Sequence, residues 1–317
     1  MTYGVLTIEG LSKEFGATKK VPALKSVNLE VNKGEIVGFV GLNGAGKTTT
    51  IRIVAGVIRP TSGSVRVEGL DAFNNHEKAA ELFSWVPENP IFDLGSNARN
   101  WLLYVSRFGS KEVSASQVDE ALSKVGLGDK GRVKLKAYSL GMKRRLALAQ
   151  AFLEEPQLLL MDEAMNGLDP EGMHFFRETV RDFRNKGGAV LLSSHVLTEI
   201  SGVSDRVSFI HRGTTFETKT LDDLKQEFQS SYGASVTFEV QGLADADLLE
   251  IGRLSGEKVS YDGKALELKS ADESVVSGVN RYLVSAGRTV TGIRRVDFNL
   301  EQLFLDKVRE ADRRMGA

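Results

Sequence analysis

A glycine-rich segment starting at residue 41 carries the residue types and the spacing that bind phosphate. It reads Gly-Leu-Asn-Gly-Ala-Gly-Lys-Thr-Thr over residues 41–49, which fits the pattern GxxxxGK[ST]. An apolar run at 36–40 precedes it and a helical pattern follows it, which is the strand–loop–helix context that the pattern requires. Backbone N–H groups of such a loop attract phosphate oxygens, and the lysine adds a full positive charge. The expected phosphate-binding residues are Gly41, Asn43, Gly44, Ala45, Gly46, Lys47, Thr48 and Thr49.

A pair of carboxylates at the end of another apolar run is the second group with chemical potential. Residues 158–161 are Leu-Leu-Leu-Met, and Asp162 and Glu163 follow directly. In phosphate-loop nucleoside triphosphatases (NTPases), such an aspartate holds Mg²⁺ together with the hydroxyl of the loop. In this sequence, that hydroxyl belongs to Thr48. Glu163 is expected to act as the base that orients and polarises the attacking water. The alternative interpretation is that Asp162 and Glu163 only cap the end of a strand. The phosphate loop upstream makes this interpretation less favoured than a catalytic role.

Composition excludes several classes of function. The 317 residues include 41 Lys and Arg against 42 Asp and Glu, so the net charge is -1, which argues against a nucleic acid backbone as the main partner. The absence of cysteine excludes disulfides, cysteine-ligated metals and a thiol nucleophile. The first ten residues show no secretory signal pattern, and no uncharged apolar run approaches the roughly 18 to 20 residues that span a bilayer. We therefore expect a chain that does not cross a membrane by itself.

The apolar patterning predicts an α/β first segment and a smaller α+β segment after it. Short apolar runs predict buried strands of a largely parallel sheet, and two more alternating runs predict an antiparallel edge. A change of periodicity near residue 220 and an Asp-Gly hairpin signal at 262–263 mark the second segment. The expected strands are 36–40, 157–161, 189–193, the edge pair 4–9 and 27–31, and then 234–240, 257–269 and 289–298; the expected helices are 76–83, 113–126, 139–154, 219–230, 245–253, 272–286 and 300–314.

The helix expected at 139–154 begins with a recognisable motif. Its apolar stripe consists of Met142, Leu146, Ala149 and Leu153, with Arg144 and Arg145 off the stripe. The sequence YSLGMK at 138–143 resembles the LSGGQ signature of the ATP-binding cassette (ABC) ATPases, and its form is similar to that of the bacitracin-resistance and drug-export branch. The resemblance implies that Ser139 and Gly141 contact a γ-phosphate. Ser139 is also a good helix N-cap, and both roles are compatible.

Further motifs of that family occur in the expected order. Phe15 resembles the aromatic residue that stacks on adenine, although a core phenylalanine on an edge strand is the alternative. Gly-Leu-Asp at 167–169 resembles the D-loop, which connects the two sites of a dimer and implies a role for Asp169 at the nucleotide. His195 resembles the histidine that contacts the γ-phosphate and the attacking water. The other histidines, His76, His174 and His211, are interpreted as surface or packing residues.

In the signature, Leu140 stands in the first glycine position and Met142 in the glutamine position, and two other positions also depart from the family pattern. Glu88 stands where a glutamine is usual, and it is a candidate to approach Mg²⁺ through water while adding a negative charge near the γ-phosphate. Ala164 stands where a proline is usual, and it lacks the rigidity of that residue.

The resemblance covers residues 4–217, and the C-terminal segment, which ends in FNLEQLFL at 298–305, is similar to an extension of the same branch. It implies a phosphate-loop ABC cassette over residues 1–220, with a helical subdomain at about 89–150, and a small α+β domain over 221–317. It also implies ATP and Mg²⁺ as cofactors, a second cassette as a head-to-tail partner, and a separate multispanning membrane permease.

The function that follows is a cytoplasmic ATPase subunit of an exporter, peripheral on the inner face of the cell membrane. The apolar and aromatic stretch 89–104 is expected to contact the permease, with a packed core as the alternative. A soluble ABC ATPase without a transport role, in cofactor assembly for example, is the alternative function. A non-catalytic regulatory cassette is disfavoured because Lys47, Asp162, Glu163 and His195 are all present. The exported substrate is not determined by this sequence.

Overall fold

The computed structural model describes residues 4–109, 111–232, 236–256, 259–269, 272–295 and 299–314. These residues gather into two compact units, which are described separately. The first consists of Met1–Leu221 and Val308–Ala317, and the second of Asp222–Lys307. Two helices, α8 (Leu221–Tyr232) and α11 (Leu300–Arg314), contribute residues to both units.

The first unit is built on a ten-stranded sheet with the order β5-β4-β1-β2-β10-β9-β3-β8-β7-β6. Strands β9, β3, β8, β7 and β6 run parallel to one another, whereas β1, β2, β4 and β5 pair antiparallel with one another. Strand β10 joins the two parts, because it is antiparallel to β9 and meets β2 in one parallel pair. The strands are β1 (Leu6–Phe15), β2 (Val21–Val31), β3 (Ile36–Val40), β4 (Ser62–Val67), β5 (Leu70–Asp71), β6 (Phe83–Val86), β7 (Leu158–Asp162), β8 (Ala189–Ser194), β9 (Arg206–His211) and β10 (Thr214–Thr220).

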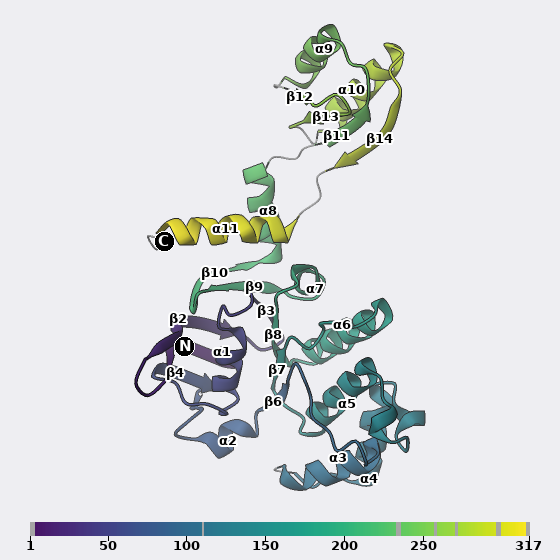
Figure 1. Cartoon of the computed structure of the whole chain (residues 1–317). Helices are drawn as coiled ribbons and strands as arrows, with labels where there is room; N and C mark the ends of the chain where they lie inside the picture. Colours follow the sequence, from purple (N-terminus) through teal and green to yellow (C-terminus); the bar gives the residue numbers. More distant parts are fainter. Residues whose placement is uncertain are drawn as a thin grey trace. The chain divides into compact units, whose positions relative to one another are not determined.

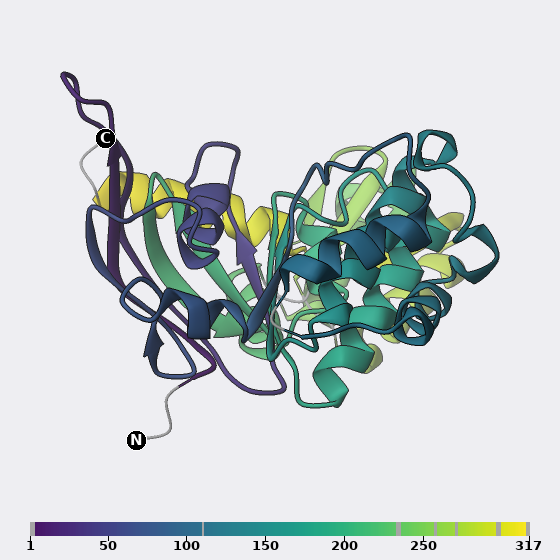
Figure 2. The same ribbon diagram turned by 90° about the horizontal axis from the view of Figure 1, so that it is seen from below.

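Some helices of the first unit connect the parallel strands, and others form a separate group. Helices α3, α4 and α5 pack together to one side of the sheet, away from β1, β2 and β4 (Figure 1). Figure 2 shows the same separation between the purple N-terminal strands and the blue helices α3 and α4. The helices are α1 (Lys47–Val54), α2 (His76–Ala80), α3 (Ala98–Val105), α4 (Ala115–Lys124), α5 (Leu140–Leu153), α6 (Pro170–Asn185) and α7 (Leu197–Ser201).

The burial of the central strands explains why the segments that form them consist almost entirely of apolar residues. Every residue of β3, β7 and β8 is buried, as expected for parallel strands covered on both faces. The expected strands at 36–40, 157–161 and 189–193 and the antiparallel edge are therefore confirmed, as is the α/β fold class. The helix predicted at 76–83 is wrong at its end, because α2 stops at Ala80 and Phe83 begins β6, which pairs in parallel with β7.

The second unit contains a four-stranded antiparallel sheet with the order β12-β13-β11-β14. Its chain order is strand–helix–strand–strand–helix–strand, the ferredoxin-like arrangement. The elements are β11 (Val236–Val240), α9 (Asp245–Ser255), β12 (Ser260–Tyr261), β13 (Ala265–Leu268), α10 (Glu273–Ser285) and β14 (Val290–Arg295).

Buried and partly exposed residues alternate along β11, and the buried ones form part of the core beneath this sheet. Val236, Phe238 and Val240 are buried and contribute to one apolar cluster with residues of α9, α10 and β13. The predicted Asp262-Gly263 turn is confirmed: Asp262 accepts backbone hydrogen bonds from residues 264 and 265, and Gly263 has a φ of 94°. Residues 234–235, 257–258 and 296–298 of the expected strands lie outside the described residues.

Candidate functional site

The phosphate loop lies between buried strand β3 and helix α1, as its sequence context predicts. Gly44 and Gly46 have φ values of 78° and 118°, a region that favours glycine. Gly41 is required for a different reason, because a Cβ on this residue would lie 2.4 Å from the carbonyl oxygen of Ile210. The glycines of the loop therefore serve both its left-handed turns and its close contact with strand β9.

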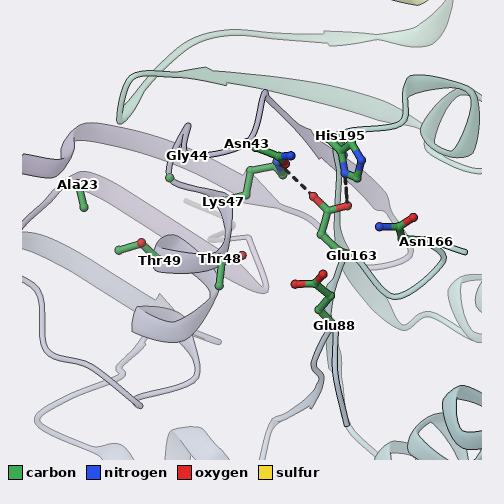
Figure 3. A pocket seen from close by; sticks show the side chains of 11 residues that line it. Ala23, Asn43, Gly44, Lys47, Thr48, Thr49, Glu88, Glu163, Asn166 and His195 are labelled. Carbon is green, nitrogen blue, oxygen red and sulfur yellow. Dashed lines mark hydrogen bonds and ion pairs between the residues drawn. The ribbon is translucent and has the colours of Figure 1, made fainter. Parts of the chain in front are cut away.

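A cavity of about 350 Å³ opens beside this loop (Figure 3). Six of the expected phosphate-loop positions contribute to its wall, and so do the three side chains predicted from later motifs, Glu88, Glu163 and His195. Two residues that the sequence interpretation did not select also line it, Ala23 from β2 and Asn166 from the segment after β7. The complete lining is Ala23, Asn43, Gly44, Gly46, Lys47, Thr48, Thr49, Glu88, Glu163, Asn166 and His195.

Lys47, Glu163 and His195 form a continuous chain of polar contacts in the cavity (Figure 3). The Nζ of Lys47 lies 3.2 Å from Oε1 of Glu163 and donates a 2.6 Å hydrogen bond to the carbonyl of Gly41. The other carboxylate oxygen, Oε2, lies 2.8 Å from Nδ1 of His195. Lys47 and Glu163 are 5% and 6% exposed, so this is a buried cation–carboxylate pair.

The parallel pairing of β7 with β8 brings Glu163 and His195 together. Asp162 is in register with Ser193, so the residues that follow each strand emerge side by side at the carboxyl edge of the sheet. The backbone N–H of Glu163 donates to the carbonyl and to the hydroxyl of Ser193, at 3.2 and 3.1 Å. Glu163 has a φ of 48°, which turns its side chain out of the strand direction.

Asp162 is held by two hydroxyl groups. Its Oδ1 accepts hydrogen bonds from Ser193 at 2.8 Å and from Thr48 at 3.1 Å. Burial raises the pKa of Asp162 above its ordinary value, the two hydroxyl groups oppose that rise, and the negative charges of Glu163 and Glu88 add to it. A cluster of carboxylates in this situation favours a cation.

The donor set fits Mg²⁺. It offers a threonine hydroxyl and carboxylates, the oxygen ligands that this ion prefers, and Mg²⁺ is commonly held by one or two protein carboxylates together with substrate phosphates and water. No cluster of three or more His, Cys, Asp or Glu suited to a metal ion occurs among the described residues.

Arg144 corrects the sequence interpretation, which placed it off the apolar stripe of its helix. The structure buries it to 4% exposure, and its guanidinium donates to the carbonyls of Ala164 and Asn166. Burial lowers the pKa of Arg144, opposed by the charges of Glu199 and Glu88. The stripe failed as a guide because this side chain leaves its own helix surface to satisfy the loop that follows Glu163.

Seven predicted residues are not part of the cavity lining: Gly41 and Ala45 of the loop, Asp162 at the end of β7, and Ser139, Gly141, Asp169 and Phe15. Ser139 caps α5, accepting from the N–H of Met142 at 3.2 Å, which confirms the N-cap prediction, and Gly141 follows in the first turn. Asp169 caps α6 through the N–H of Gly172. Phe15 ends β1 with 43% of its surface exposed, under the ammonium of Lys13 at 5.1 Å. Their contacts with nucleotide stay predictions.

The remaining histidines differ from one another. His76 and His174 are both exposed, and Nδ1 of His76 lies 3.3 Å from the carbonyl of Ala72; both residues agree with the prediction of packing or surface residues. His211 is buried, and its Nε2 lies 2.9 Å from Oδ1 of Asp312, a residue 101 positions away. Nothing in the local sequence around His211 indicates that partner.

Comparison with known proteins agrees with this geometry. The family model described as ABC transporter matches residues 24–166. The chain is 35% identical over 309 residues to an uncharacterized ABC transporter ATP-binding protein, YdbJ of Bacillus subtilis, with 96% of each chain covered. It is 37% identical over 235 residues to the bacitracin transport ATP-binding protein BcrA of Bacillus licheniformis, covering 72% of this chain and 75% of that one.

A solved structure of the ATP-binding subunit of an ABC transporter superposes with a TM-score of 0.63 and 29% identity, covering 71% of this chain and 93% of the other. The phosphate loop, the carboxylates after β7 and the relatives all point to the same family. The chain belongs to the ATP-binding proteins of the ABC transporters, and it is an ATPase of that family.

Proposed function

We propose that this protein is the ATP-hydrolysing subunit of an exporter whose membrane-spanning part is a separate, multispanning permease. The observation that carries the proposal is the contact chain of Lys47, Glu163 and His195 beside the phosphate loop. The similarity to a bacitracin transport ATP-binding protein supports the export role. No relative reported above favours the soluble alternative.

The residues divide the chemistry between them. Lys47 and the loop N–H groups bind the β- and γ-phosphates of ATP. Thr48 and Asp162, with Glu88 nearby, would hold Mg²⁺, which when bound neutralises charge on the phosphate oxygens. Glu163 accepts a proton from the attacking water or orients it, and His195, 2.8 Å from its carboxylate, keeps that carboxylate in place and reaches toward the γ-phosphate.

A second copy of the chain completes the site. Ser139 and Gly141 lie at the N-terminus of α5 and do not line the cavity around Lys47. A helix N-terminus attracts an anion, so this one would bind the γ-phosphate held by another cassette. Phe15 and Asp169 would contact adenine and connect the two sites. ATP closes the dimer because it binds both faces at once, and hydrolysis reopens it.

The exposed apolar side chains of α3 and of the segment that joins β6 to it support a permease contact. Ile91, Leu94 and Tyr104 are 89%, 48% and 55% exposed, whereas Phe92 and Leu102 of the same stretch are buried. The stretch 89–104 is thus part core and part surface, and its surface part suits a partner of apolar character.

In the part of the chain that the structure describes, no helix has the length and apolar character needed to span a membrane. We place the protein in the cytoplasm, attached to the inner face of the cell membrane through the permease.

We also propose residues 1–220 as the ATP-binding domain, with the helical subdomain near 89–150, and 221–317 as a small C-terminal domain.

Affinity purification of the full chain from detergent-solubilised membranes of its own cells tests the export proposal. A multispanning membrane protein should co-purify in stoichiometric amount, and ATP turnover of the complex should exceed that of the isolated chain. Ile91→Asp should abolish the co-purification, whereas Val284→Asp, at an exposed apolar residue of the second unit, should not. Recovery of only soluble partners would contradict the proposal and favour the alternative.

A further inference from the structure

A two-residue turn between β9 and β10 contacts the phosphate loop. Its residues Arg212 and Gly213 have φ values of 47° and 79°, and His211 pairs with Thr214 across it. Two consecutive positive φ values are the pattern of a tight hairpin turn, and for an arginine that conformation is uncommon. The turn therefore needs contacts from its surroundings to keep it in place.

This turn is hydrogen-bonded to the phosphate loop. The N–H of Gly213 donates a 2.8 Å hydrogen bond to the carbonyl of Ala45, in the middle of the loop. The carbonyl of Gly213 accepts from the N–H groups of Lys25 and Ser26 on β2, at 2.8 and 3.3 Å. A Cβ on Gly213 would lie 2.7 Å from the carbonyl oxygen of Ala23, so the turn packs closely against β2 and only glycine fits at this position.

A carboxylate from the far end of the chain holds the other side of the turn. Oδ1 of Asp312 lies 2.9 Å from Nε2 of His211 and 3.3 Å from a guanidinium nitrogen of Arg212. The side chain of His211 is 9% exposed and that of Asp312 is 31% exposed, so the contact between them is partly shielded from water. Asp312 is in the part of α11 that belongs to the first compact unit, and the same helix begins in the second unit.

We infer that Asp312 is a positioning residue for nucleotide binding: by holding His211 and Arg212 it fixes the turn that donates to Ala45, and thereby keeps the phosphate loop in its binding shape. A loop that is already ordered loses less conformational entropy when ATP binds. The inference rests on the proposed role of the phosphate loop as the ATP site.

The expected signature is a change in affinity rather than in chemistry. Glu163 and His195 are positioned by β7, β8 and Ser193, and among the described residues the turn forms no hydrogen bond or ion pair with either of them. Loss of the Asp312 contact should therefore raise the dissociation constant and the KM for ATP and leave kcat unchanged within about two-fold.

The experiment compares variants of the full chain. Asp312→Asn is expected to weaken binding of a non-hydrolysable ATP analogue, measured by calorimetry, by about 3- to 10-fold, which is the net effect of one ordinary hydrogen bond. Asp312→Glu should recover part of the affinity. Asp119→Asn is the matched control, because it removes an exposed carboxylate 2.7 Å from Arg99 in the helical group.

A second pair of variants separates positioning from loss of stability. His211→Gln and the double variant with Asp312→Asn should show non-additive effects on the dissociation constant, because the two residues act as one contact. Additive effects, or a lower Tm with unchanged affinity and KM, would overturn the inference. If Asp312→Asn fails to fold, His211→Gln alone must still weaken affinity without lowering kcat. Failure of the wild-type chain to bind the analogue would instead refute the proposed function.

Discussion

The ammonium group of Lys47 lies 3.2 Å from the carboxylate of Glu163, and both side chains are almost fully buried. The residue proposed to bind phosphate and the residue proposed to activate water thus contact each other directly. A buried ion pair stays favourable only while both partners are present, since removal of one leaves an unpaired charge. Nucleotide phosphates would compete with Glu163 for Lys47, which links phosphate binding to the release of the base.

Glu163→Gln should retain ATP binding and lose turnover. The amide keeps the size and the hydrogen-bonding capacity of the side chain but cannot accept a proton from water, so kcat should fall by about 10²- to 10⁴-fold. With hydrolysis blocked, an ATP-dependent dimer should accumulate in gel filtration. Glu178→Gln, at an exposed glutamate paired with Arg181, serves as the control. Unchanged hydrolysis would remove Glu163 from the role of base.

Lys47→Ala should weaken nucleotide binding itself. It removes the cation at the phosphate loop and leaves Glu163 buried without its ion-pair partner, so the dissociation constant for ATP should rise at least about ten-fold. The Tm should be compared with that of Lys111→Ala, which loses only an exposed pair with Glu155. If affinity survives unaltered, the assignment of the phosphate loop is wrong.

Arg144→Lys should lower kcat more than it lowers affinity. A lysine keeps the charge but lacks the planar guanidinium that donates to the carbonyls of Ala164 and Asn166. The segment after Glu163 would then be less ordered, and we expect kcat to fall about ten-fold with the KM for ATP within about two-fold. The neighbouring Arg145, which stacks on Phe175 at 4.1 Å, provides the control Arg145→Lys. Equal effects of both substitutions would contradict a special role for Arg144.

Glu199→Gln should stabilise the fold as the pH rises. Burial raises the pKa of Glu199 above its ordinary 4.5, although Ser194 donates to the carboxylate and His195 and Arg144 favour its charge. The folded state therefore binds the proton more tightly than the unfolded state. The stability that Glu199 contributes is fully present below 4.5 and is lost as the pH rises through the raised pKa.

Glutamine imitates the protonated form at every pH, so the gain in the free energy of unfolding should be larger at pH 8 than at pH 5. Urea denaturation of both proteins at the two pH values measures it, with Glu178→Gln as the exposed control. A gain that shrinks between pH 5 and pH 8 would show that the folded state favours the charged form of Glu199.

Much of the site was predictable because its parts are short patterns with a fixed chain direction. A buried strand, a glycine loop and a helix must place Lys47 and Thr48 at a helix N-terminus. Asp162 is the last residue of one buried strand and His195 follows another, and parallel strands end at one edge of a sheet. The similar order of these motifs in a known family supported the same assignment.

Other features depend on side chains that reach across the fold. Arg144 was misjudged because helical periodicity describes one helix and not the loop packed against it. Ala23 and Asn166 line the cavity without any motif of their own, since strand order brings them there. The boundary between α2 and β6 was misplaced because pairing with β7 outweighed the local helical pattern.

The sequence by itself determined the family, the phosphate loop, the carboxylates and the α/β architecture, because these depend on residue type and on spacing along the chain. Only the tertiary structure decided that Lys47 pairs with Glu163, that Arg144 holds the loop after it, and that Asp312 reaches His211. Those contacts join residues separated by 116, 20 and 101 positions, and their partners are chosen by which elements pack together and which buried charges must be satisfied.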